Sequence, residues 1–477
     1  MIGIYMFGAA LVLLAIGYPV AFSFGFVSLV FGAISVYFEL VPDGITFALF
    51  YEEFMSMFSM MPFRIYSIMT NKILLAVPLF IFMGIVLQKS KLAEKLLEAM
   101  GTLFGNIRGG VAISTVIVGT MLAASTGVVG ASVVAMGVIS LPVMLKYGYS
   151  KPLACGTICA SGTLGQIIPP SIILIILADV FGVAVGDLFK AAVMPSLILV
   201  GSYIVYILII LADVFGVAVG DLFKAAVIPS VVLVSSYIIY ILIISYLNPS
   251  IAPALKIDES ISKKQRIITA LKAIIPPITL IIIVLGSIFA GIATPTESAS
   301  IGAVGSLLLA GLYKELNMTI VMDSAKQTVQ ITAMVFAILI GATAFSLVFV
   351  YTGADGIVEE FMMGLPGEKW GFIILSMLII FVLGFFIDFI EISYIVVPIL
   401  MPIAENLGLS PIWFAILIAM NLQSSFLTPP FGFSLFYLKG VAKDIKTTDI
   451  YKGVVPFIII QMLVLAILVV FPHWFGF

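Results

Sequence analysis

The sequence GQIIPPS at residues 165–171 and the sequence FLTPP at residues 426–430 each place a double proline inside a long apolar segment. Proline removes a backbone donor and disrupts the hydrogen bond to the carbonyl four residues earlier, so each pair should interrupt a helix. A kink satisfied by neighbouring helices is the simple interpretation of one pair. Two related pairs favour a functional interpretation, because interrupted helices offer carbonyl oxygens to a cation and helix N-termini to an anion.

The two proline pairs belong to a longer internal repeat. Five proline, glycine and serine positions recur 260 residues later without a gap. Five predicted membrane crossings separate equivalent elements, and because five is odd the two halves should lie in opposite orientations. Inverted repeats with interrupted helices at matching positions are typical of secondary transporters. The matched residues are Pro142, Gly148, Ser150, Pro169 and Pro170 in the first half and Pro402, Gly408, Ser410, Pro429 and Pro430 in the second.

The composition places these segments in a membrane. The 477 residues are 62% hydrophobic and 10% charged, with a mean hydropathy of +1.29. Soluble domains carry about a quarter charged residues, so a soluble enzyme is excluded. A net charge of −2 without a basic stripe excludes nucleic-acid binding. Two cysteines, Cys155 and Cys159, and the single His473 cannot form a protein zinc site of the usual kind.

The hydropathy pattern predicts an all-α polytopic membrane protein with ten net crossings and two re-entrant hairpins. One hairpin precedes the Pro-Pro-broken helix of each half, and residues 91–104 are expected to form an amphipathic interfacial helix. The predicted crossings are 1–17, 19–38, 72–89, 152–176 and 190–210 in the first half and 274–293, 297–313, 329–351, 412–438 and 454–475 in the second, with hairpins at 111–141 and 371–401.

The distribution of lysine and arginine sets the orientation. With the N-terminus outside, most of the 22 Lys and Arg residues fall in cytoplasmic loops, including the basic loop 256–272, and the outer loops are acidic. Both termini are therefore predicted to be periplasmic.

A second, tandem repeat complicates this topology. Residues 177–210 and 211–244 differ only at positions 194, 197, 198, 201 and 205 and their counterparts. A second copy that added a crossing would turn loop 256–272 outward, against the charge rule. We therefore expect the two copies together to contribute one net crossing, unless the duplication is an artefact of the sequence.

Small and polar residues near the breaks and hairpin turns are the candidate ligands. Hydroxyl and amide groups can bind Na⁺ or a polar substrate without burying a charge. In the second hairpin, Asp388 and Glu391 can share a face; buried acids favour a function, and a structural hydrogen bond to the hairpin backbone is the alternative. The other candidates are Ser125, Thr126 and Gly127 in the first hairpin, Ser161, Gly162, Thr163, Gly165 and Gln166 before the first break, and Asn421, Gln423, Ser424, Ser425 and Thr428 before the second.

Two further motifs have an ordinary structural interpretation. Thr294, Pro295, Thr296 and Glu297 make a sound helix start, because proline suits the first helical position and an acid suits the first turn. The sequence Arg108-Gly109-Gly110 precedes the first hairpin and is equally compatible with a plain turn carrying a cytoplasmic anchor.

At these residues the sequence resembles the large membrane subunit of a TRAP (tripartite ATP-independent periplasmic) transporter, within the ion transporter superfamily. Singly the motifs are short, but their order and spacing are specific. They are GYPVA at 17–21, AVPLF at 76–80, RGGVA at 108–112, STG at 125–127, GQIIPPS at 165–171, TPTESA at 294–299, NL at 421–422 and LTPP at 427–430.

The resemblance implies a bacterial inner-membrane permease with an inverted-repeat, elevator-type fold. It also implies a separate small four-helix membrane subunit and a periplasmic receptor that delivers an organic acid, such as a C4-dicarboxylate or sialic acid. Scaffold and arm helices would occupy 1–110 and 274–370, and the hairpins with their broken helices would form the transport segments 111–176 and 371–442. Residues 177–273 would hold a scaffold helix with the duplication and a cytoplasmic loop, and 443–477 a C-terminal scaffold helix.

The resemblance also implies positions for the transported species. No cofactor is expected, and Na⁺ would be the coupling ion. A first Na⁺ site would involve Ser125, Gly127, Thr163 and Gly165, and a second would involve Asp388, Ser424 and Thr428. Substrate would lie between them, near Ser125, Thr126, Gln166, Asn421, Ser425 and Thr428.

Three other functions were weighed. A receptor-independent Na⁺-coupled dicarboxylate or citrate carrier of the same superfamily stays open. An intramembrane aspartyl protease needs two facing acids in fixed motifs, which Asp388 and Glu391 on one turn do not supply, so the protein is not expected to be an enzyme. A channel is disfavoured because paired hairpins with broken helices favour alternating access over a continuous pore.

Overall fold

The fold was analysed in a computed structural model of the chain. The structure describes residues 1–71, 74–90, 92–104, 108–126, 129–166, 172–185, 187–188, 191, 237–248, 250–252, 263–290 and 292–475. Within these ranges every regular element is helical. The predicted helix at 190–210 and nearly all of the tandem repeat from residue 189 to 236 lie outside the described residues.

The first helices begin and end where the sequence provides the local signal. Helix α1 (Ile2–Ile16) ends at Gly17, whose φ of 98° a glycine adopts without strain, and Pro19 caps the start of α2 (Val20–Leu40). The α-helices that follow are α3 (Phe47–Phe58), α4 (Met61–Thr70), α5 (Ala76–Lys89) and α6 (Leu92–Phe104). The amphipathic helix predicted at 91–104 is therefore present as α6.

Two long helices form the first hairpin, and a short interrupted pair follows it. The hairpin helices are α7 (Gly110–Thr126) and α8 (Val129–Lys146), and the pair consists of α9 (Lys151–Thr163) with the 3-10 turn Leu164–Gln166 and α10 (Ile172–Val180). A further helix covers Tyr237–Leu247.

The second half starts with three long elements and repeats the hairpin arrangement. Thirteen residues of connection before Lys263 aside, its helices are α13 (Lys263–Phe289), α14 (Pro295–Leu312), α15 (Met318–Tyr351), α16 (Ala354–Met363), α17 (Lys369–Leu383), α18 (Phe389–Glu391), a π-helix at Ile392–Val396, α19 (Val397–Asn406), α20 (Pro411–Leu427), α21 (Phe433–Val441) and α22 (Thr447–Val470).

The helix boundaries carry the repeat that the sequence predicted. Helix α8 starts at Val129 and ends at Lys146, and the continuous helical stretch Phe389–Asn406 has the same bounds 260 residues later. Helices α9 and α20 start at Lys151 and Pro411, which keep the same spacing. The repeated glycines, serines and prolines therefore mark repeated helix ends.

Six described helices are long and apolar enough to cross a membrane, or seven if the bent pair of α5 and α6 is one span. This is fewer than the ten predicted crossings. Helices α1 and α5 have only 15 and 14 residues, and a 14-residue helix is about 21 Å long. The interrupted helices are also split into pieces shorter than a full span. The six are Val20–Leu40, Val129–Lys146, Ile267–Ile288, Met318–Tyr351, Phe389–Asn406 and Thr447–Val470.

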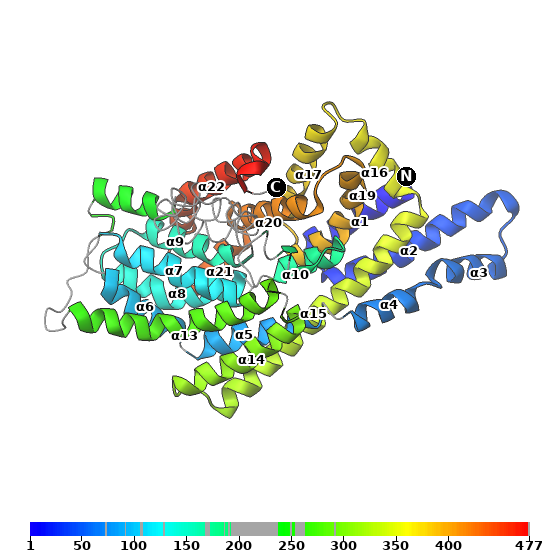
Figure 1. The fold of residues 1–477 in the computed structure, drawn as a ribbon. Coiled ribbons are helices and arrows are strands. Elements are labelled where there is room, and N and C mark those ends of the chain that lie inside the picture. The colour runs from blue at the N-terminus through cyan, green and yellow to red at the C-terminus, as the bar shows by residue number, and fades with distance from the viewer. Residues whose placement is uncertain are drawn as a thin grey trace, which may run out of the picture.

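The helices form one elongated body in which α15 runs between two ends (Figure 1). Helices α2, α3 and α4 lie at one end, and α6, α7, α8 and α9 lie at the other. Phe7 and Phe24 pack on Phe345 of α15, with ring centroids 6.2 Å and 5.0 Å apart. These contacts attach the N-terminal helices to the second half of the chain.

Helix α22 packs closely on α9. A Cβ on Gly156 would overlap the carbonyl of Gly453, and a Cβ on Gly453 would overlap the carbonyl of Pro152. Phe457 on α22 is completely buried and meets Tyr237 and Tyr240 at centroid distances of 4.8 Å and 5.3 Å. The C-terminal helix, α9 and the end of the tandem repeat are therefore one packed unit.

Candidate functional site

The helix interruption predicted at the second double proline is present. Helix α20 ends at Leu427 and α21 begins at Phe433, and the Pro429–Pro430 peptide bond between them is cis. In the first half α9 ends at Thr163 and α10 begins at Ile172. Pro169 and Pro170 themselves lie outside the described residues.

The backbone around the second break has side-chain partners. The Ser434 hydroxyl donates to the carbonyl of Phe426 at 2.8 Å, and the Tyr451 hydroxyl donates to the carbonyl of Pro430 at 3.1 Å. Gly432 permits this close return of the chain, since a Cβ there would lie 2.6 Å from the Phe426 oxygen. Each carbonyl oxygen has two lone pairs, so one hydrogen bond leaves acceptor capacity for a cation.

The polar side chains of α20 are buried and mostly satisfied within the protein. The Ser424 hydroxyl donates to the Met420 carbonyl at 3.0 Å, and the Ser425 hydroxyl donates to the Leu422 carbonyl at 2.8 Å. The Asn421 amide donates to the Met377 carbonyl at 2.6 Å and so ties α20 to α17. After these bonds the hydroxyl oxygens of both serines still have lone pairs for a ligand.

Gln423 differs from these neighbours. Its side chain is 0% exposed, and neither its amide nitrogen nor its amide oxygen has a hydrogen-bond partner. Burying an unpaired amide costs several kcal/mol. The sequence placed Gln423 beside the break but did not include it in a site, because side-chain satisfaction is not visible in a sequence.

Thr428 and Ser425 connect the break to the tip of the second hairpin. The Thr428 hydroxyl donates to the Ser424 carbonyl at 2.7 Å. At Gly384, which follows α17, an added Cβ would overlap the Ser425 side chain. Asn421, Ser424, Ser425 and Thr428 therefore lie together on the last turns of α20, next to the hairpin. The sequence missed the role of Gly384, for which a single glycine in an apolar run gives little signal.

Asp388 and Glu391 form the start of the second arm of this hairpin. The Asp388 carboxylate accepts a hydrogen bond from the Phe389 backbone N–H at 2.7 Å and caps the helix. Glu391 is 4% exposed, interacts with the backbone of Asp388, and has one carboxylate oxygen without a partner. The structural alternative, a hydrogen bond to the hairpin backbone, therefore holds for part of this pair and leaves one oxygen of Glu391 unsatisfied. The π-helix that follows widens the backbone immediately after these acids.

The first hairpin shows a similar approach between turn and break. Gly165 lies against the backbone of Ala123 near the end of α7, with a Cβ position 2.5 Å from the Ala123 carbonyl carbon. The Thr163 hydroxyl is buried and donates to the Ala160 carbonyl at 2.9 Å. Ser125 and Thr126 end α7, while Gly127 and the side chain of Gln166 are outside the described part of the chain. Thr163 and Gly165 are thus brought to the end of the helix that carries Ser125 and Thr126.

Helix α21 links the two halves. Gly130 of α8 faces Tyr437 of α21, with its Cβ position 2.8 Å from the ring. The Cys159 thiol of α9 donates to the Ser434 carbonyl at 3.7 Å. The helix that follows the second break therefore packs directly on the first hairpin and its broken helix.

The motif from Thr294 to Glu297 is the helix start that the sequence predicted. The Thr294 hydroxyl accepts from the Glu297 backbone N–H at 3.3 Å, and the Glu297 carboxylate accepts from the Thr294 backbone N–H at 2.7 Å. This reciprocal pair is a capping box, and Pro295 follows the cap at the first helical position.

The chemistry of these two clusters is that of a site for hard ions and polar solutes. Among the described residues no three His, Cys, Asp or Glu side chains gather as ligands of a metal ion. Hydroxyls, amides and backbone carbonyls supply the polar atoms instead, together with the two acids of the second hairpin. Oxygen ligands of this kind suit hard cations.

Comparison with known proteins fits this arrangement. The family model of the tripartite ATP-independent periplasmic transporter, DctM component, matches residues 7–212 and 203–474. The chain belongs to this family. It is therefore a multi-pass membrane transporter subunit and not an enzyme. The two matched ranges meet inside the tandem repeat of the sequence.

Curated relatives span most of the chain. It is 28% identical to the C4-dicarboxylate TRAP transporter large permease protein DctM of Rhodobacter capsulatus over 84% of this chain and 85% of that protein. It is 24% identical to the sialic acid TRAP transporter large permease protein SiaM of Vibrio cholerae over 85% of each. The fold is similar to the crystal structure of the Alcanivorax borkumensis YdaH transporter, with a TM-score of 0.52, 14% identity, and coverage of 89% and 90% of the two chains.

Proposed function

We propose that this DctM-family chain is the permease subunit of a Na⁺-coupled, receptor-dependent secondary transporter that imports an organic acid. The observation that carries the proposal is the approach of each hairpin to the broken helix of its own half. Gly165 meets the end of α7, and Ser425 meets Gly384 at the end of α17. Two such junctions place unpaired helix ends and oxygen ligands at matching positions in the repeat.

The cargo is proposed from the relatives and from the site together. The names of the two relatives specify a C4-dicarboxylate and sialic acid, both of which carry carboxylate groups. The described side chains of the two junctions include no lysine or arginine. A carboxylate bound there would be balanced by helix N-termini and by co-transported Na⁺ rather than by a fixed cation.

An elevator movement is proposed for alternating access. The moving part would contain α7–α10 and α17–α21, and α1–α6 with α13–α16 would form the scaffold. Although the sequence analysis grouped residues 443–477 with the scaffold, the close glycine contacts between α9 and α22 favour moving α22 with the hairpins. A bacterial inner-membrane location with periplasmic termini follows from the family and from the charge rule.

The family name indicates a tripartite system. We propose a small membrane subunit and a periplasmic receptor as the two other components. Because the receptor would select the solute before delivery, it would hold much of the specificity.

The test is co-reconstitution of the permease, small subunit and receptor in liposomes with an inward Na⁺ gradient. We expect uptake of a labelled organic acid that requires both Na⁺ and receptor. Uptake that ignores the Na⁺ gradient would remove the coupling, and uptake without receptor would favour the receptor-independent carrier. Thr428→Ala should raise the Na⁺ concentration needed for half-maximal uptake, whereas Thr343→Ala, which removes a comparable hydroxyl from α15, should not.

A further inference from the structure

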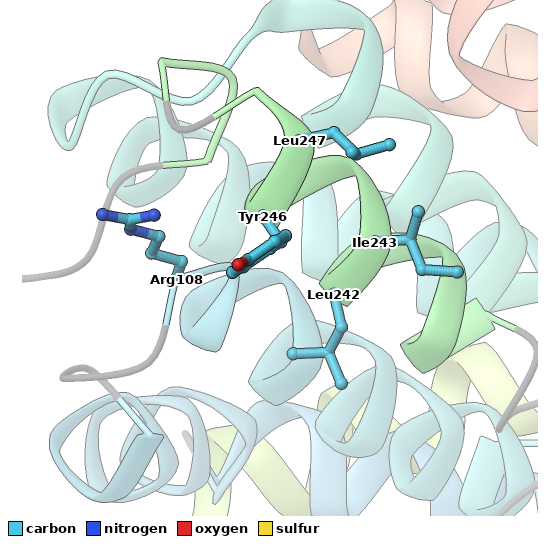
Figure 2. A pocket seen from close by; sticks show the side chains of 5 residues that line it. All are labelled: Arg108, Leu242, Ile243, Tyr246 and Leu247. Carbon is cyan, nitrogen blue, oxygen red and sulfur yellow. The ribbon is translucent and has the colours of Figure 1, made fainter.

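A groove lies away from the proposed transport site, beside the helix Tyr237–Leu247. Its volume is about 660 Å³, within the size range of small-molecule pockets. Figure 2 shows the lining side chains, with the Tyr246 ring beside Arg108 and the aliphatic residues on the same helix as the tyrosine. The lining residues are Arg108, Leu242, Ile243, Tyr246 and Leu247.

The lining combines one cation, one phenol hydroxyl and a continuous aliphatic wall. Tyr246 is 77% exposed and Leu247 is 66% exposed, and Ile243 is also exposed. Arg108 forms no ion pair and no side-chain hydrogen bond in the described part of the protein. A guanidinium above exposed aliphatic side chains matches an amphiphile with an anionic end.

The groove lies where the chain gathers positive charge. The Gly109 N–H donates to the Ala252 carbonyl at 3.1 Å, and the Ser150 N–H donates to the Ile251 carbonyl at 2.8 Å. These two bonds place Arg108 and the residue after Ser150, which is a lysine, on either side of the same short segment. The charge rule assigns this end to the cytoplasmic face, where anionic lipids attract basic residues.

We propose that this groove binds one anionic phospholipid, with its phosphate on Arg108 and the Tyr246 hydroxyl and an acyl chain along Leu242, Ile243 and Leu247. The lipid would join the end of the tandem repeat to the start of the first hairpin. Ser245 on the same helix already lies against Gly109, with the Cβ position of the glycine 2.6 Å from the serine oxygen. A bound lipid would cover the exposed side of that contact.

The test is native mass spectrometry of the purified full-length permease titrated with phosphatidylglycerol or with phosphatidylcholine of the same acyl chains. We expect one phosphatidylglycerol to bind in preference to phosphatidylcholine. Arg108→Gln should weaken that binding roughly fivefold, because a basic residue near an anionic lipid contributes about 1 kcal/mol. Arg64→Gln, at an exposed arginine of α4, is the matched control and should leave binding unchanged.

Two further arms separate the lipid from other ligands and from loss of folding. Soluble glycerol phosphate should not compete, because it lacks the acyl chain that the aliphatic wall would hold. Tyr246→Phe keeps the ring and should weaken binding less than Arg108→Gln while leaving the thermal unfolding midpoint in detergent unchanged. Equal binding of the two lipids, equal loss in the Arg64 variant, or competition by glycerol phosphate would each overturn the proposal.

Discussion

Deleting residues 177–210, one copy of the tandem repeat, should leave the protein folded with its topology intact. The structure describes the start of the first copy and the end of the second, and both are packed in the core. Leu177 and Leu188 are completely buried at one end, as are Tyr237 and Ile241 at the other. In the deletion variant Leu211 and Leu222 replace Leu177 and Leu188 with identical side chains.

The expected change in stability follows from chain length. The connection between Leu188 and its packed continuation at Tyr237 shortens from 48 residues to 14. The loop-closure relation gives a gain of about 1 kcal/mol for that shortening. Fourteen helical residues reach about 21 Å, whereas the removed copy would span about 51 Å as a helix. The variant should therefore unfold at the same temperature as the full chain or slightly above it.

The assay combines thermal unfolding in detergent with labelling of a cysteine placed by Lys264→Cys. Cys155 and Cys159 are completely buried, so the native thiols should give little background. The introduced cysteine should be labelled only from the cytoplasmic side, both with and without the deletion. Deletion of residues 194–210, half of one copy, is the control and should unfold the protein because it leaves a broken unit.

Two results would refute the reasoning. If the 34-residue deletion aggregates while the full chain is stable, the second copy is a structural requirement. If the cysteine at position 264 changes sides between the two proteins, the extra copy adds a net crossing and the inverted repeat fails.

Three other substitutions test the junctions and one helix start. Gly384→Ala should destabilise the protein by about 1–3 kcal/mol in thermal unfolding because the new methyl group meets a buried serine of α20, whereas Gly356→Ala, with open space around it, should not. Thr428→Ala should raise the half-maximal Na⁺ concentration for uptake roughly fivefold, the equivalent of one hydrogen bond of about 1 kcal/mol; an unchanged Na⁺ dependence would contradict its assignment to the cation site. Thr294→Ala should lower stability by about 1 kcal/mol through loss of the helix cap without changing the Na⁺ dependence, and a changed dependence would assign this motif to transport.

Several features followed from the sequence because their physical cause is local. Proline cannot continue a hydrogen-bonded helix, so the interruption after Leu427 was predictable from FLTPP alone. The capping box at Thr294 and the end of α1 at Gly17 have causes that lie within a few residues. The repeat of 260 residues was visible in the sequence, and the matching bounds of α8 and the stretch Phe389–Asn406 show that it marks helix ends.

The tertiary structure decided which of the candidate groups remain available to a ligand. Asn421, Ser424 and Ser425 looked equivalent to Gln423 in the sequence, yet the first three bond to backbone carbonyls and only Gln423 has a fully unpaired amide. The packing of α22 on α9 was equally hidden, because Gly156 and Gly453 lie almost 300 residues apart. Helix length and helix breaks depend on neighbours in the chain, whereas satisfaction of a buried polar group depends on neighbours in space, and folding alone brings those together.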